Sequence, residues 1–388
     1  MSVDKRPKCP ICRAPMNANG KTSSRTPRWR CRNCSFSTVL KRPDVTRRHD
    51  LEAFINYATG KTSQAERDGT LTGRSFRQRT SWCWQVPPPL PVMDGVIHDQ
   101  VFIDGIFLSH SWVILIATDG RTPLNWVTAG RENATAYTQL LSPLPPPGII
   151  TTDGAGGALA AIRTLWGPDQ PVQRCLVHVH RNNTVDLTHN PHTPAGKALK
   201  GLSHSLLRVT TMDEAAHWAS LLAAFHTEYA HYLKERTYAS QDPEKAAATG
   251  KKWWYTHERD RRVYYRLERL LKNKQLFTFL TDPGRPNLAS TTNPIESLNA
   301  QIRALLRAHA GWNTTRQITA IHWFLAHHQH PINAATVLAE WDKHARQPHT
   351  IIPTTHKQQP RPDGPTHYDN AYSPDTGFHT RKGWAGRT

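Results

Sequence analysis

The order of secondary structure predicted over residues 101–179 constrains the fold more than any other feature of this chain of 388 residues. Apolar, β-branched runs predict three strands joined by short turns, and then two more strands that alternate with helices. The strands are residues 101–108, 112–118, 125–129, 148–152 and 172–179, and the helices are 135–141 and 157–166. Short turns suit an antiparallel meander, whereas a helix between two strands suits parallel pairing. The pattern therefore predicts an α/β domain with a mixed five-stranded sheet.

Two aspartates in these strands are candidate catalytic acids. The element order is that of a ribonuclease-H-like domain, in which the first and fourth strands are parallel neighbours. Asp104 lies inside the first strand and Asp153 ends the fourth, so both carboxylates are expected at one end of the sheet. An ionised group inside a strand is costly unless a partner such as a metal ion compensates it. Asp119 follows the second, antiparallel strand and is expected at the opposite end as a turn residue.

A third carboxylate is offered by Glu296. Its local sequence also fits a capping box, with Asn293 as N-cap, Pro294 in the first turn and Glu296 at the third position. The helix that follows has an apolar stripe, made of Ile295, Leu298, Ile302, Leu305 and Leu306. Glu296, Asn299, Arg303 and Arg307 form a second face at spacings of three and four. One acid leading into arginines suits a metal ion beside a phosphate backbone.

Three carboxylates can hold two hard divalent cations, Mg²⁺ or Mn²⁺, through oxygen. Such a pair activates water or a DNA 3′-hydroxyl and stabilises the leaving oxygen during displacement at phosphorus. No covalent intermediate is needed, which fits a chain without an evident activated Ser or Tyr nucleophile.

Two Cys-x-x-Cys pairs stand near the start of the chain. Cys9 and Cys12 are separated by 18 residues from Cys31 and Cys34, which is the spacing of a structural zinc site. The alternative is a coincidence of two pairs. Arg28 and Arg30 lie on the expected hairpin between the pairs and are candidate DNA contacts.

Residues 46–85 predict a helix-turn-helix. Leu51, Phe54, Ile55 and Ala58 follow helical spacing, and a short second helix over 63–68 precedes a third helix that begins after Thr72. The third helix carries Arg74, Arg77 and Arg79, which are candidates to enter a major groove. A small helical linker domain is the alternative.

The complete domain prediction has seven segments. They are a zinc ribbon (1–45), a helix-turn-helix (46–85), a Pro-rich linker (86–93), the first part of the core (94–185), an all-helical insertion (186–285), the last part of the core (286–345) and a disordered tail (346–388).

Charge indicates the partner. The formal net charge is +19, and residues 1–50 hold 13 Lys and Arg against 3 Asp and Glu. Clustering of this kind is typical of proteins that bind DNA, although a merely soluble basic protein is the alternative. No secretory signal or membrane-length apolar run stands out, and the paired cysteines do not resemble a disulfide framework. We therefore expect a soluble, cytoplasmic protein associated with DNA.

At these residues the chain resembles bacterial insertion-sequence transposases of the Mutator-like superfamily. The likeness covers about residues 95–330. It lies in the order of two Asp-Gly motifs, Cys175-Leu-Val-His178, and Thr291-Thr-Asn-Pro-Ile-Glu-Ser-Leu-Asn299. The resemblance implies a ribonuclease-H-like core interrupted by a helical insertion, with Asp104, Asp153 and Glu296 as the catalytic acids.

Further candidate residues have open roles. Cys175 and His178 match the superfamily signature and are expected to support the acids, as are Asn293, Asn299 and Arg303. The alternative for the first two is a packed Cys and a hydrogen-bonded His on the fifth strand. Trp253 and Trp254, among basic residues of the insertion, are candidates to stack on an unpaired base. Packing within a small helical core is the alternative.

The function predicted from the sequence is a DNA transposase with two Mg²⁺ or Mn²⁺ ions and one structural Zn²⁺. Its expected partners are double-stranded DNA, as terminal inverted repeats and target, and other copies of the chain, which form a homodimer or a larger assembly on paired ends. The alternatives are a domesticated DNA-binding protein without catalysis and a ribonuclease-H-like nuclease.

Overall fold

The computed structural model describes residues 6–9, 12–39, 43–62, 66, 73–108, 111–282, 284 and 288–344. These residues divide into two compact units. The first comprises the described parts of Met1–Ala58, Thr62–Val86 and Asn333–Pro348, and the second comprises Thr59–Lys61 and the described parts of Pro87–Ile332. None of the described helices is long and apolar enough to cross a membrane.

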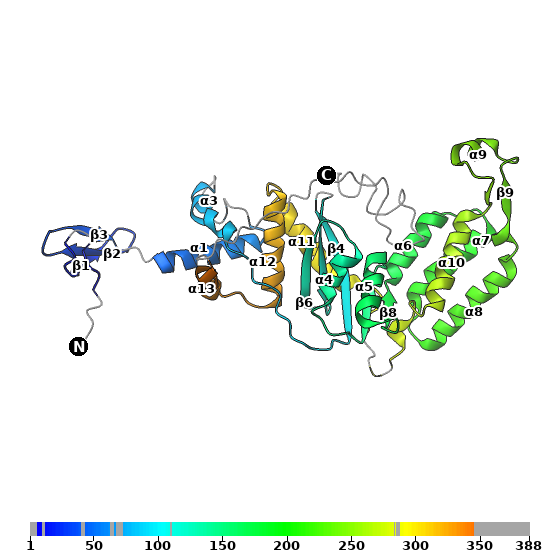
Figure 1. Ribbon diagram of the computed structural model, residues 1–388, viewed down its shortest axis with the longest axis horizontal. Coiled ribbons are helices and arrows are strands. Elements are labelled where there is room, and N and C mark those ends of the chain that lie inside the picture. Colours follow the sequence, from blue (N-terminus) through cyan, green and yellow to red (C-terminus); the bar gives the residue numbers. More distant parts are fainter. Residues whose placement is uncertain are drawn as a thin grey trace. The chain divides into compact units, whose positions relative to one another are not determined.

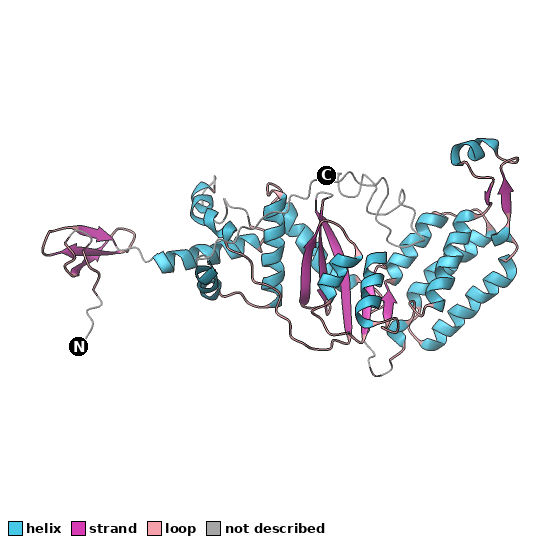
Figure 2. Cartoon of the chain, viewed as in Figure 1, coloured by secondary structure: helices cyan, strands magenta, loops and turns pink. Residues whose placement is uncertain are grey.

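A mixed five-stranded sheet organises the second unit (Figures 1 and 2). Its strands are β4 (Gln100–Leu108), β5 (Trp112–Thr118), β6 (Pro123–Ala129), β7 (Ile149–Thr152) and β8 (Val172–Arg174). Their order across the sheet is β6-β5-β4-β7-β8. The three consecutive strands pair antiparallel, and β4, β7 and β8 pair parallel. The predicted α/β class and mixed sheet are confirmed.

Alternation along β4 gives the sheet two different faces. Val101 and Ile103 lie in a buried cluster with α4 (Ala134–Leu141) and α5 (Gly156–Trp166). The intervening side chains, among them Asp104, project to the opposite face because neighbouring residues of a strand point to opposite sides. There α11 (Asn293–Ala308) packs on β4 and α12 (Thr314–Gln329) packs on β6. The sheet is thus sandwiched between two helical layers.

The fifth strand is shorter than the sequence predicted. It ends at Arg174, and α6 (Leu176–Leu187) begins two residues later with Cys175 as its N-cap. The expectation of strand structure through residue 179 was therefore wrong. The apolar run was ambiguous because a short stretch such as Cys175-Leu-Val suits a buried helix start as well as a strand.

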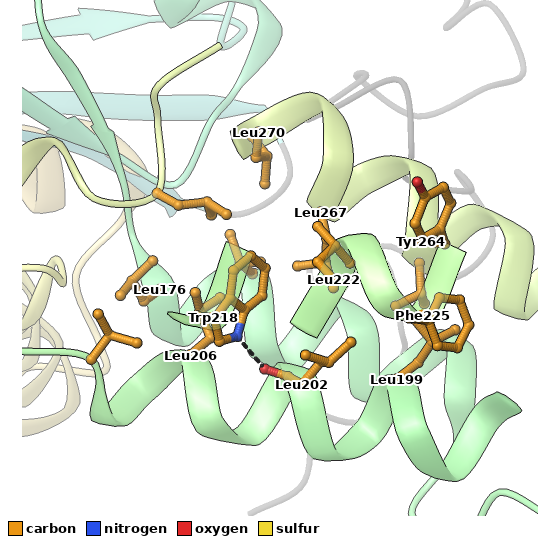
Figure 3. Packing of buried hydrophobic residues seen from close by; sticks show 14 of the residues in the cluster. Leu176, Leu199, Leu202, Leu206, Trp218, Leu222, Phe225, Tyr264, Leu267 and Leu270 are labelled. Atoms are coloured by element: carbon orange, nitrogen blue, oxygen red, sulfur yellow. Dashed lines mark hydrogen bonds between the residues drawn. The ribbon is translucent and has the colours of Figure 1, made fainter. Parts of the chain in front are cut away.

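The helices after the sheet form their own hydrophobic core (Figure 3). They are α6, α7 (Pro194–Ser205), α8 (Met212–Tyr229) and α10 (Glu258–Lys272). The short helix α9 (Pro243–Thr249) lies in the same segment but contributes no buried residue to this core. Trp218 of α8 is almost wholly buried, and its indole nitrogen donates a 2.9 Å hydrogen bond to the Leu202 carbonyl. That bond satisfies the one polar atom of a large buried side chain.

This segment is not all-helical. Strands β9 (Arg236–Tyr238) and β10 (Trp253–Tyr255) pair antiparallel and carry α9 between them (Figure 1). Aromatic and β-branched residues dominate both strands, which favours pairing.

The first unit combines a small sheet with helices. The strands β1 (Met16–Lys21), β2 (Pro27–Cys31) and β3 (Ser37–Val39) form an antiparallel sheet. The helices are α1 (Pro43–Ala58), α3 (Arg74–Thr80), a 3₁₀ turn (Ser81–Gln85) and α13 (Ala334–His344). Leu51, Phe54, Ile55 and Ala58 are buried on α1, as their spacing predicted.

The chain's last described helix belongs to this first unit. α13 packs on α1, with Trp341 stacked on Trp82 at a ring separation of 5.7 Å. Arg47 lies over both rings and forms a 2.8 Å ion pair with Asp342. The sequence predicted the residues of α13 to lie in the last part of the core (286–345). The local sequence of an amphipathic helix does not show whether it packs on the first unit or on the second. The predicted second helix over 63–68, the cap Thr72 and the tail from 346 onward lie largely or wholly outside the described residues.

Candidate active site and metal centre

Four cysteine thiols converge beside the small sheet of the first unit. The Sγ atoms of Cys9 and Cys34 are 3.5 Å apart, and Cys12 lies 3.4 Å from Cys31 and 3.6 Å from Cys34. Four sulfurs bound to one tetrahedral Zn²⁺ at about 2.3 Å would be separated by about 3.8 Å. The thiols therefore fit a structural zinc ion, as their spacing in the sequence predicted.

The backbone repeats one turn at both cysteine pairs. The Cys9 amide donates to the Ala14 carbonyl, and the Cys31 amide donates to the Phe36 carbonyl. Arg13 and Ser35, each directly after the second cysteine of its pair, have positive φ angles of 57°. The two equivalent turns present two thiolates each to a common centre.

The two candidate aspartates meet through the parallel register of β4 and β7. Phe102 pairs with Thr151, so Asp104 and Asp153, each two residues further along, come level with one another. Desolvation raises the pKa of Asp104 to about 7, and the negative charge of Asp153 acts in the same direction. Two carboxylates held together in a partly buried position favour a bound cation.

Asp153 lies on a tight turn directly after β7. Its Oδ1 accepts a 3.0 Å hydrogen bond from the Ala155 amide, and the Gly154 amide donates to Thr152 Oγ1 at 3.1 Å. The Asp119 turn after β5 is built alike, with Asp119 Oδ1 accepting from the amides of residues 121 and 122. Because β5 is antiparallel to β4, Asp119 lies near the start of β4, as expected for a turn residue.

Helix α11 brings Glu296 and Asn299 to the same face of the sheet. Its N-cap is Thr292 rather than Asn293, and no side chain caps the first turn. The capping box, which was the alternative role of Glu296, is therefore absent. Glu296 Oε1 instead accepts a 3.2 Å hydrogen bond from Thr292 Oγ1. One turn along, the fully buried Asn299 donates from Nδ2 to Asp104 Oδ2 at 2.6 Å.

Cys175 and His178 lie against the start of α11. The Cys175 thiol accepts hydrogen bonds from the amide and hydroxyl of Thr292, at 3.3 and 3.2 Å. Burial opposes ionisation of this thiol, but hydrogen bonding to His178 and Thr292 outweighs it and lowers the pKa. Burial likewise opposes protonation of His178, yet the neighbouring Cys175 and the two aspartates raise its pKa to about 9. The Nδ1 atom of His178 lies 4.0 Å from Glu296 Oε1.

The three acids are spaced too widely for a single compact ligand set. Among the described residues, the four cysteines alone form a group of at least three His, Cys, Asp or Glu side chains with all ligand atoms within 4.8 Å. A site for two metal ions about 3.5–4 Å apart needs carboxylates spread around both ions, whereas a site for one ion needs carboxylates gathered around that ion. Carboxylate oxygens are the donors that hard divalent cations prefer.

The other candidate residues are distributed as follows. Arg28 and Arg30 are exposed on β2, and Arg74, Arg77 and Arg79 are exposed on α3. Arg79 also forms a 2.9 Å ion pair with Asp50. Arg303 is exposed one turn beyond Asn299, and its charge lowers the Asp104 pKa.

The two adjacent tryptophans of β10 differ in how exposed they are. Trp254 is only 7% exposed and lies under Lys245, whose Nζ is 4.7 Å from the ring centroid. Trp253 is 37% exposed and stacks with Arg236, whose Cζ is 4.1 Å from its ring. Trp253 is therefore the more accessible of the two rings.

Sequence reasoning missed three buried residues around the acids. Thr292 is described above. Gln100 holds the backbone of Ala289 from both sides, donating to its carbonyl at 2.7 Å and accepting from its amide at 2.8 Å. Arg174 donates to the Asp153 carbonyl at 2.5 Å. A cation at the end of a buried strand is as costly as Asp104 inside one, and that signal could have identified Arg174.

A scan of the chain against models of known protein families found no match, and a search of curated proteins found no similar protein.

Proposed function

We propose that this protein is a DNA transposase whose catalytic acids are Asp104, Asp153 and Glu296. The observation that supports this most is the convergence of three separate segments on one face of the sheet. The parallel register of β4 and β7 brings Asp104 level with Asp153, and the Asn299–Asp104 hydrogen bond holds α11 to the same place. Converging carboxylates on rigid strands and a helix are typical of divalent-metal phosphoryl transfer.

The fold supports the same proposal. A sheet of order β6-β5-β4-β7-β8, antiparallel on one side of β4 and parallel on the other, is the arrangement expected of a ribonuclease-H-like core. The helices between β8 and α11 correspond to the insertion that the resemblance to Mutator-like transposases implies. Membership of that superfamily is part of the proposal.

Each residue near the acids has a distinct role in this proposal. Two bound Mg²⁺ or Mn²⁺ ions would activate the attacking hydroxyl and stabilise the leaving oxygen. Asn299 fixes the Asp104 carboxylate by donating to one of its oxygens. Thr292 orients Glu296, and His178 Nδ1 lies 4.0 Å from the same Glu296 oxygen. Arg303 is exposed near Asp104 and is suited to a DNA phosphate.

The first unit supports sequence-directed DNA binding. Its exposed arginines on β2 and α3 are the candidate contacts, and the zinc centre would hold the β2 hairpin in shape. Phosphate contacts of this kind weaken steeply with salt because counterions are released.

Cleavage of the element's own ends tests the proposal. The substrate is a supercoiled plasmid that carries the DNA flanking this reading frame, where a pair of inverted repeats is expected. We expect strand cleavage and strand transfer with Mg²⁺ or Mn²⁺, and none with EDTA.

Matched variants identify the acids. Glu296→Gln keeps the size and the hydrogen-bond acceptor, so it should fold normally while cleavage falls about a hundredfold or more, which is roughly 2.7 kcal/mol of transition-state stabilisation. Asp104→Asn and Asp153→Asn should behave alike, and Asp119→Asn should remain active. An active, folded Glu296→Gln protein would exclude Glu296 as a ligand.

Two alternatives predict other outcomes in the same assay. A domesticated DNA-binding protein would bind the ends without cutting them under any metal condition. A ribonuclease-H-like nuclease would cut without strand transfer and without preference for the repeats.

A further inference from the structure

The Asp153 turn is covered by a buried arginine, whereas the otherwise similar Asp119 turn is not. Both have the sequence Thr-Asp-Gly, both have a glycine with positive φ, +94° at Gly154 and +96° at Gly120, and in both the glycine amide donates to the threonine hydroxyl. The local sequence therefore accounts for the shape of each turn. It does not account for what lies against the turn.

Arg174 makes the difference. Parallel pairing brings Arg174 of β8 level with Thr152 of β7, and its side chain reaches two residues forward. Its Nη2 donates to the Asp153 carbonyl at 2.5 Å. A Cβ atom built on Gly154 would lie only 1.7 Å from the guanidinium carbon, so the guanidinium occupies the space that any side chain there would need.

Arg174 is only 2% exposed. Burying a cation costs several kcal/mol unless nearby groups compensate it, and an apolar residue at the end of a sheet strand would avoid that cost. Its guanidinium donates to the backbone of the turn that carries a candidate metal ligand.

We propose that Arg174 is a positioning residue that locks the Asp153–Gly154 turn and so aims the Asp153 carboxylate at the metal site. The proposal rests on the proposed function, because it assigns Arg174 to the same divalent-metal centre. Groups that orient metal ligands typically change metal affinity or activity by about 10–100-fold when removed. The contact also requires Gly154, because only glycine leaves room for the Arg174 guanidinium.

The test measures Mn²⁺ binding to the full-length, zinc-loaded protein by calorimetry, without DNA. Arg174→Met keeps much of the side-chain length but removes the charge and donors, and we expect its Mn²⁺ affinity to fall about 10–100-fold. Arg163→Met is the matched control, because Arg163 is exposed on α5. Arg174→Lys keeps the cation without the planar fork and should lose less affinity than Arg174→Met.

A second pair of variants approaches the same contact from the other side. Gly154→Ala should displace the guanidinium and lower Mn²⁺ affinity. Gly167→Ala imposes similar backbone strain, at a φ of +89°, but its Cβ would meet nothing within 4 Å, so its affinity should stay unchanged. In the double variant Arg174→Met/Gly154→Ala the two losses should not add, because they break one contact.

The outcomes separate the two proposals. A folded Arg174→Met protein with wild-type Mn²⁺ affinity overturns the role of Arg174 alone. Should Arg174→Met fail to fold, equal affinity in Gly154→Ala and Gly167→Ala overturns it instead. Wild-type protein that binds no Mn²⁺ overturns both the proposed metal centre and the role of Arg174.

Discussion

Asn299→Leu should separate stability from activity. Asn299 is fully buried and donates a 2.6 Å hydrogen bond to Asp104, while its own Oδ1 has no hydrogen-bond partner among the described residues. Losing a hydrogen bond to a charged group costs about 1.5–3 kcal/mol, and removing a buried unsatisfied carbonyl regains about 1–3 kcal/mol. The two effects partly cancel, so the free energy of unfolding should change by no more than about 2 kcal/mol.

Activity should respond differently. Without the Asn299 donor, the Asp104 carboxylate is free to rotate away from the position that binds metal, and we expect metal-dependent cleavage to fall about 10–100-fold. The expected loss corresponds to about 1.4–2.7 kcal/mol in the transition state. A residue kept for packing would show the reverse pattern.

The measurement pairs calorimetric unfolding with the plasmid cleavage assay. A stability change of up to about 2 kcal/mol shifts the melting temperature of a unit this large by no more than about 4–8 °C. Gln301→Leu, on the exposed side of α11, is the control for adding an apolar side chain to this helix. A protein destabilised by about 4 kcal/mol or more, with undiminished cleavage by its folded fraction, would refute the reasoning.

Three further predictions follow from other parts of the chain. Purified protein should contain one zinc ion, which a Cys9→Ser/Cys12→Ser variant loses; zinc retained in full by that variant contradicts the site. Trp341→Ala removes the stack on Trp82 and should destabilise the first unit by about 1–2 kcal/mol in calorimetry, whereas an unchanged melting curve would mean that α13 adds nothing. Burial lowers the pKa of His322 from 6.5 to about 4, so the unfolded chain binds the extra proton between these values and stability is lost as pH falls through them. His322→Gln should flatten that part of the melting temperature–pH curve, and an identical slope in both proteins would count against it.

The sequence alone identified the features that depend on neighbours along the chain. The cysteine spacing was enough to predict the four-cysteine cluster because each pair forms its own turn before the two pairs meet. The strands from Gln100 to Ala129 and the helices packed on them followed from alternation and helical periodicity, since one face of each must be buried. The sequence also distinguished Asp119 from Asp153, although their turns are similar. The order of connections gives the direction of each strand, and the strand before Asp119 is antiparallel to β4 whereas the strand before Asp153 is parallel to it.

Tertiary structure decided the features that depend on partners far apart in the sequence. Local sequence made Asn293 a good helix cap, but the contact of Thr292 with Cys175, 117 residues away, makes Thr292 the N-cap and leaves Glu296 outside a capping box. No periodicity could show that α13 packs on α1, because an amphipathic helix specifies a buried face and not its partner. Periodicity also could not show that Arg174 lies against Gly154. That contact depends on the register of the parallel strands β7 and β8, which pairs Thr152 with Arg174. The sequence was enough to single out the candidate acids, whereas the residues proposed to position them come together only when β7, β8 and α11 pack.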